Sequence, residues 1–329
     1  MAAIAESIDA PRKLPRIGIL DTARGIALLA MASYHFTWDL EFFGYLEAGT
    51  AETGWLKIYA RVIASTFLYL AGFSLVLANT PEIRWRSYLK RLGMIVAAAA
   101  AISLVTFIGM RDEWIYFGIL HSIAAASILG LLFLRLPRAM TLLVAVILLA
   151  GIYVDNIEAP FYLHSDIFDL PWLRWIGLSN HLPRSNDYVP IFPWFTPFLF
   201  GLGIAQAALA GGWLSRLSRF GPGTNLVARA GRHSLAFYLV HQPLLFGLVY
   251  LLSVAAPAPK PDPTHAYLRQ CNASCTKSAG EALCQSFCQC TLDKLQAQQL
   301  FEPLQSGKIK ADDNEQISRI AIQCTADAQ

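Results

Sequence analysis

Four ionisable residues lie in one apolar segment near the start of the chain: Asp21, Arg24, His35 and Asp39. The segment is about long enough to cross a bilayer as a helix, and charges at membrane depth are costly enough to mark functional sites by default. On such a helix the four side chains share one polar stripe, with Arg24 and His35 about 16 Å apart along the axis. This spacing predicts an arginine end that holds an anion and an imidazole end that performs chemistry.

The chemistry indicated by this stripe is proton transfer. His35 and Asp39 are one helical turn apart, where a carboxylate can orient an imidazole and raise its basicity. We therefore expect His35 to act as a general base, with Asp39 as its orienting group. The alternative is that the four residues pair inside a helix bundle and only fix its packing.

Two further histidines fall in other apolar segments. His121 lies near the outer end of one segment, and His241 lies in the middle of the last one. Each fits an ordinary buried histidine, and both also fit a cavity shared with His35, where one of them would polarise a reacting carbonyl. Ligation of a haem or quinone by His35, His121 and His241 is a weaker alternative, because axial ligation needs two facing histidines at one depth.

A polar, proline-rich stretch precedes the segment that begins near residue 191. Its side chains crowd the mouth of that segment, and Asp187 and Tyr188 are the candidates for contacts with an acceptor. An aromatic belt with ordinary loop polarity is the alternative.

The composition predicts an all-α, polytopic transmembrane bundle. Hydrophobic residues make up 55% of the 329 positions and charged residues only 15%. The net charge of +3 is small and the basic residues cluster beside apolar runs, as topology signals do, so we expect membrane lipid and no nucleic acid as a partner. Seven stretches qualify as spans: 17–40, 55–78, 92–109, 118–134, 140–154, 191–209 and 233–254.

The basic clusters set the expected orientation. They precede the first span and lie between spans two and three, four and five, and six and seven, so the positive-inside rule places the N-terminus in the cytoplasm and the C-terminus outside. We expect a bacterial inner-membrane protein with four parts: residues 1–16 as a leader, 17–255 as a transmembrane domain, 256–264 as a linker and 265–329 as an extracytoplasmic helical domain. We also expect a homodimer, because a complete tunnel needs more spans than the seven predicted here.

All six cysteines fall after the last predicted span: Cys271, Cys275, Cys284, Cys288, Cys290 and Cys324. An even set confined to a polar tail indicates disulfides in an oxidising compartment. We expect two stapled helices, with Cys271 paired to Cys288 and Cys275 to Cys284. A zinc site at Cys284, Cys288 and Cys290 is the alternative; we expect no metal and no tightly bound cofactor.

Four segments together resemble the bacterial branch of the heparan-α-glucosaminide N-acetyltransferase catalytic family. They are RIGILDTARGIALL from residue 16, GILHSIA from 118, YVPIFPW from 188 and GRHSLAFYLVHQ from 231. The first segment is also similar to the acyltransferase type three family, in which an arginine and a histidine are separated by ten residues, as Arg24 and His35 are. The resemblance covers about residues 14–255.

The resemblance implies a membrane enzyme that moves an acetyl group from cytoplasmic acetyl-CoA to a hydroxyl or amine of an extracytoplasmic glycan or other acceptor. His35 would be the base and Arg24 part of the donor site. The animal lysosomal enzyme instead has asparagine at the position of His35 and its active histidine in the following loop, which here holds none. We expect the acyl-CoA site to comprise Asp21, Arg24, Arg86, Arg91 and Arg232. A small-solute or proton-coupled transporter is the alternative function.

Overall fold

The computed structural model describes residues 17–155, 163–218, 224–258, 262–276, 279–311 and 314–328. Within these ranges the regular elements are helices, with one isolated parallel bridge between Phe117 and Tyr188. The all-α prediction is therefore confirmed for the described part of the chain. The predicted leader, residues 1–16, and residues 259–261 of the predicted linker lie outside it.

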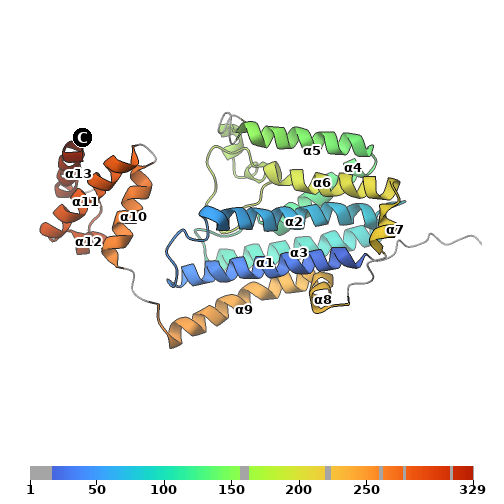
Figure 1. Cartoon of the computed structure of the whole chain (residues 1–329), viewed down its shortest axis with the longest axis horizontal. Coiled ribbons are helices and arrows are strands. Elements are labelled where there is room, and N and C mark those ends of the chain that lie inside the picture. Colours follow the sequence, from blue (N-terminus) through green and yellow to red (C-terminus); the bar gives the residue numbers. More distant parts are fainter. Residues whose placement is uncertain are drawn as a thin grey trace, which may run out of the picture. The chain divides into compact units, whose positions relative to one another are not determined.

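The chain divides into two compact units, Met1–Leu252 and Ser253–Gln329. In the first unit, long helices run side by side along a common direction (Figure 1). They are α1 (Gly18–Phe42), α2 (Gly54–Ala78), α3 (Trp85–Gly109), α4 (Ile119–Leu134), α5 (Arg138–Tyr153), α6 (Ile191–Ala210) and α9 (Ser234–Ala255). The short helices α7 (Trp213–Ser218) and α8 (Leu226–Arg232) lie between α6 and α9 in the chain.

A helix is thus present at each of the seven stretches expected to span the membrane. Among the described residues, α2, α3, α6 and α9 are long and apolar enough to cross it, whereas α4 and α5 are shorter apolar helices. Helix α1 is as long as α2 but carries the charged stripe. Four candidate spans are therefore present, and a count of seven stays a prediction.

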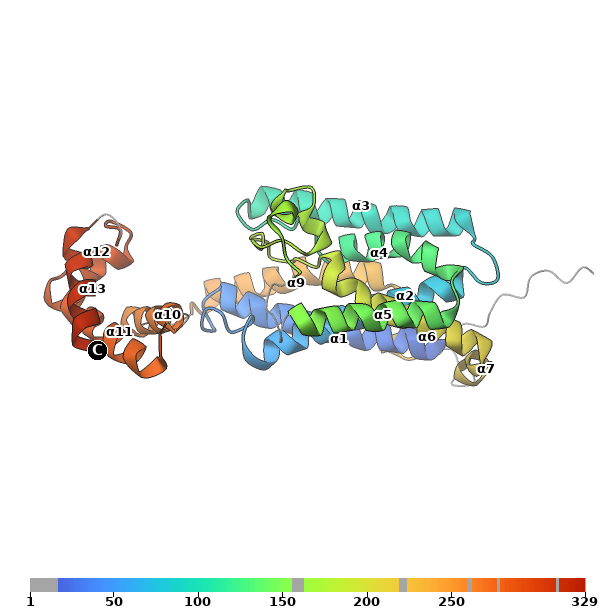
Figure 2. The ribbon, with the colours of Figure 1, turned by 90° about the horizontal axis from the view of Figure 1, so that it is seen from above.

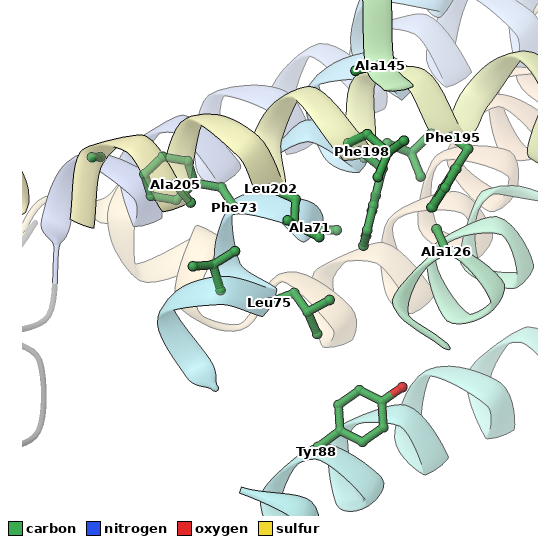
Figure 3. Packing of buried hydrophobic residues seen from close by; sticks show 14 of the residues in the cluster. Ala71, Phe73, Leu75, Tyr88, Ala126, Ala145, Phe195, Phe198, Leu202 and Ala205 are labelled. Carbon is green, nitrogen blue, oxygen red and sulfur yellow. The ribbon is translucent and has the colours of Figure 1, made fainter. Parts of the chain in front are cut away.

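The core of the first unit lies between α2 and α6, which contact each other more extensively than any other pair of helices. A Cβ atom on Gly72 would lie 2.1 Å from the carbonyl oxygen of Phe198, and one on Gly201 would lie 2.0 Å from that of Tyr69. Glycine at both positions lets the two backbones touch, as small residues do where membrane helices cross. Figure 3 shows Phe198 and Leu202 of α6 packed beside Ala71 of α2.

The outer helices of the unit expose apolar surface. About half of the most apolar stretch of α2 and of α6 is buried within the protein, against 11% for α3 and α9. In water such faces would be unstable, so α3 and α9 are suited to contact lipid. Helix α7 lies at one end of the bundle and the segment between α5 and α6 at the opposite end, in both views (Figures 1 and 2). This segment contains the short helices η2 (Asp166–Asp169) and η3 (Arg174–Ile176).

The second unit comprises α10 (Pro263–Cys275), α11 (Glu281–Ala297), α12 (Phe301–Gln305) and α13 (Glu315–Ala328). Disulfides join Cys271 to Cys288 and Cys275 to Cys284, so both expected pairings are confirmed, and a third joins Cys290 to Cys324. All six cysteines are consumed, which rules out the alternative zinc site on three of them. The small core around Leu292 and Leu295 is thereby cross-linked.

Candidate active site

A cavity of about 710 Å³ opens among α1, α2, α3, α4, α8 and α9. Its wall is mainly apolar, and its ionisable side chains are those of Asp21, Arg24, Arg91, Arg232 and His233. The cavity therefore suits an elongated ligand with an anionic head and a less polar arm. Arg86, which we expected in the same group, is exposed and does not line the cavity. It lies on the outward face of α3, five residues before Arg91, so the two point in different directions.

Arg24 is held in the cavity wall by one residue of its own helix and by one residue of α2. Its Nη1 atom lies 3.0 Å from Oδ1 of the buried Asp21, and its Nη2 atom donates to Ser74 Oγ on α2. The Arg91 guanidinium on α3 lies within electrostatic range of Arg24. Among the described residues, two guanidinium groups lie beside one carboxylate, and this arrangement favours an anionic ligand.

Close packing of α8 on α1 brings Arg232 and His233 to the same region. A Cβ atom on Gly231 would lie 1.9 Å from the backbone oxygen of Asp21, so only glycine allows this approach. Asn225 caps α8 by accepting a hydrogen bond from Ala228 N at 2.7 Å. The sequence signal for this arrangement is the glycine just before Arg232.

The predicted base, His35, faces His241 across the α1–α9 contact. Their ring centroids are 5.1 Å apart, and the His241 ring also contacts that of Tyr238, which lines the cavity. His241 Nδ1 lies 2.7 Å from the carbonyl oxygen of Tyr238. Because a carbonyl only accepts, Nδ1 carries the proton and Nε2 holds a lone pair. That Nε2 atom is buried and has no hydrogen-bond partner in the described part of the chain.

Asp39 does not orient His35 as expected. Its Oδ1 atom accepts a hydrogen bond from Gln242 Nε2 at 2.8 Å, and its Oδ2 atom is buried with no partner among the described residues. The carboxylate turns toward α9 because Gln242 offers an amide donor there, whereas an i, i+4 contact would need both side chains to lean along α1. Asp39 therefore ties α1 to α9. Gln242 follows His241 directly in the chain and was not among the predicted site residues.

His35 and His241 lie next to the cavity and do not themselves line it, and His121 does not line it either. Gly118 N donates to His121 Nδ1 at 3.2 Å, and His121 Nε2 lies 3.2 Å from Ser103 Oγ. Since Ser103 already donates to the carbonyl of Ile115, its oxygen accepts the Nε2 proton. Both ring nitrogens are thus satisfied locally, so the structure brings His35 together with His241 but not with His121.

Asp187 lies next to the cavity, whereas the Tyr188 side chain is hydrogen-bonded within the segment between α5 and α6. Asp187 Oδ2 accepts a hydrogen bond at 2.9 Å from the backbone N–H of Ile119, a lining residue at the start of α4. Burial raises the pKa of this carboxyl group to about 6. The Tyr188 hydroxyl donates to the carbonyl of Arg174 at 2.6 Å, and its ring stacks on Tyr116.

Comparison with known proteins gives one match. No curated protein and no solved structure matches the chain. The model of the family described as heparan-alpha-glucosaminide N-acetyltransferase, catalytic, matches residues 16–243. This range covers more than half of the chain and includes every lining residue of the cavity together with His35 and His241. The chain therefore belongs to the heparan-α-glucosaminide N-acetyltransferase catalytic family and is a membrane acetyltransferase.

Proposed function

We propose that this enzyme takes an acetyl group from acetyl-CoA at the cytoplasmic face and delivers it to a hydroxyl or amine of an extracytoplasmic glycan or other acceptor. The observation that carries the proposal is the cavity itself: an arginine-lined region at one part of its wall, and Tyr238, in contact with His241, at another. A transporter is not favoured, because the family match is to an acetyltransferase.

Acetyl-CoA would bind in the cavity in one orientation, with its phosphates at the arginines. Arg24, Arg91 and Arg232 would receive the phosphates of acetyl-CoA, since guanidinium groups match phosphate oxygens in geometry and charge. The pantetheine arm would follow the apolar wall formed by residues such as Leu28 and Ile123. This placement brings the thioester toward Tyr238 and the neighbouring histidines.

His35 is the base in this proposal. It is half-buried, whereas His241 is 7% exposed, so His35 is the imidazole that an acceptor can reach. His35 would remove the proton of the acceptor hydroxyl or amine while the acceptor oxygen or nitrogen bonds to the acetyl carbon and the carbon–sulfur bond breaks. The proton then passes to the sulfur, releasing CoA as a thiol. This sequential route needs one base and no covalent enzyme intermediate.

The proposed orientation places the phosphate end in the cytoplasm and the disulfide-bonded unit outside it. Arginines in the described segments between α2 and α3, between α4 and α5, and in α7 and α8 support the first part; Arg12, Lys13, Arg16 and Arg219, which also entered the prediction, lie outside the described residues. Three disulfides support the second, because such bonds persist in oxidising compartments.

Purified enzyme in liposomes tests the activity. Acetyl-CoA carrying a labelled acetyl group is supplied with a panel of amino sugars, neutral sugars and glycan fragments, and the products are separated by mass. We expect acetylation of at least one acceptor and competitive inhibition by free CoA. Absence of transfer to every acceptor, with no binding of CoA, would contradict the proposal.

A further inference from the structure

The expected partner of the catalytic imidazole is engaged elsewhere. An imidazole acts efficiently as a base when its other nitrogen is held by a fixed group, because this sets the tautomer and stabilises the imidazolium that forms. Asp39 was expected to do this for His35, but its Oδ1 atom is hydrogen-bonded to Gln242 on α9. In this structure Asp39 therefore ties α1 to α9 and does not hold the His35 ring.

His241 has the features that this role requires. Its Nδ1–H donates to the carbonyl of Tyr238, which locks the tautomer and leaves the Nε2 lone pair as an acceptor. Nε2 is buried without a partner in the described part of the chain, although a buried acceptor is normally paired. The His35 ring lies against it, with centroids 5.1 Å apart and the planes inclined by 59°.

Resting on the proposed function, we infer that His241 is the positioning residue for His35: its Nε2 atom accepts an N–H of His35 in the reacting complex, which leaves the other nitrogen of His35 as the base. This hydrogen bond between His35 and His241 need not be formed before substrates bind, because catalytic hydrogen bonds tighten in the substrate complex. The Asp39–Gln242 pair supports this arrangement by tying α1 to α9 next to both histidines.

The proton and bond changes balance without a further reactant. The acceptor transfers its proton to the free nitrogen of His35 as the new bond to the acetyl carbon forms. The imidazolium keeps its other N–H on His241 Nε2, and it returns one proton to the departing sulfur as the carbon–sulfur bond breaks. A neutral imidazole partner suits membrane depth better than a carboxylate, because no permanent charge has to be buried.

The test compares two substitutions of His241 in the full-length enzyme in liposomes. His241→Gln retains an acceptor oxygen, whereas His241→Leu removes it at similar size. We expect His241→Leu to lower kcat about 10- to 100-fold, the size found for outer partners that orient an imidazole, with the KM for acetyl-CoA changed less than about 3-fold. His241→Gln should recover much of kcat. Leu244→Ala is the matched control, because Leu244 lies on the same helix and is 66% exposed.

A second measurement keeps the inference testable without turnover. Nitrogen NMR of ¹⁵N-histidine-labelled protein, with His35 assigned from a His35→Gln sample, reports its tautomer. We expect one dominant tautomer in wild type with bound CoA, the same one in His241→Gln, and a mixture in His241→Leu. Equal kcat in all variants, or a loss in both variants with the His35 tautomer unchanged, would overturn the inference. An inactive wild type that still shows this tautomer pattern would contradict only the proposed function.

Discussion

The imidazole rings of His35 and His241 are in contact, and this contact joins α1 to α9. The two residues are separated by more than two hundred positions in the chain, yet they meet beside the wall of one cavity. In the proposed function, the arginines of the cavity hold the donor and this pair of histidines lies where the acetyl group is transferred.

Arg91 and Arg232 should set the affinity for the donor. Replacing either by alanine removes charge-assisted hydrogen bonds to phosphate of about 1.5–3 kcal/mol, which corresponds to a KM for acetyl-CoA raised roughly 10- to 100-fold with kcat little changed. Steady-state kinetics in liposomes measures both constants. Arg86→Ala is the matched control, since Arg86 lies on the same helix as Arg91 but outside the cavity. An equal effect of Arg86→Ala would show that general surface charge, not the cavity, attracts the donor.

Gly231 should be intolerant of any side chain. Alanine at this position places a methyl group 1.9 Å from the Asp21 oxygen, so α8 must move away from α1 and carry Arg232 with it. Such overpacking costs about 1–3 kcal/mol, and we expect a lower thermal unfolding temperature together with a higher KM for acetyl-CoA. Gly247→Ala, which meets no atom within 4 Å, is the control and should keep both values. An unfolding temperature of Gly231→Ala equal to that of wild type would argue against the close α1–α8 contact.

Asp187 should make stability depend on pH. Burial raises the pKa of its carboxyl group from 3.8 to about 6, so the folded state binds this proton more tightly than the unfolded state does. The corresponding stabilisation is complete below about pH 4 and is lost as the pH rises through about 6, by up to roughly 3 kcal/mol. Asp187→Asn keeps an acceptor for Ile119 N but does not titrate, so its unfolding free energy relative to wild type should rise between pH 4 and 7. Thermal unfolding at several pH values measures this; a difference that stays constant with pH would refute it.

The second unit, which carries all six cysteines, should contain no reactive thiol until its disulfides are reduced. All six cysteines are paired, and the bond from Cys290 to Cys324 closes the longest loop, with a sequence separation of 34. Membrane-impermeant maleimide applied to intact cells should label nothing before reduction and should label the unit afterwards. Removing the Cys290–Cys324 bond by a double serine substitution should lower the stability of the unit by about 2–5 kcal/mol. Labelling that needs permeabilised cells, or abundant free thiols, would overturn the proposed orientation.

The sequence sufficed for the helices but not for the contacts between them. Apolar runs predicted a helix at each of seven stretches because length and hydropathy are local properties, and the cysteine spacing predicted two disulfides. The stripe of charged residues on α1 was visible for the same reason, and Arg24 does line the cavity. The partner of His35 could not be read locally, since a helical i, i+4 spacing permits a His35–Asp39 contact without requiring it.

The contacts of Asp39 and His121 are set by polar side chains on other helices. Gln242 attracts Asp39, and Ser103 satisfies His121; neither is near its partner in sequence. Arg86 and Arg91 carry the same charge and lie five residues apart, but only one faces the cavity, because that choice depends on how α3 is rotated against its neighbours.

We propose that Arg24 and His35 belong to the donor end and the reaction end of one transmembrane acetyl-transfer path. Inside-out vesicles containing wild-type or His35→Ala protein are supplied with acetyl-CoA labelled in the acetyl group, and label is followed on the lumenal face. We expect labelled acceptor in wild-type vesicles, a loss of about 10²- to 10⁴-fold with His35→Ala, and unchanged CoA binding by that variant. Transfer that survives the substitution would show that His35 is not the base and would refute the proposed mechanism.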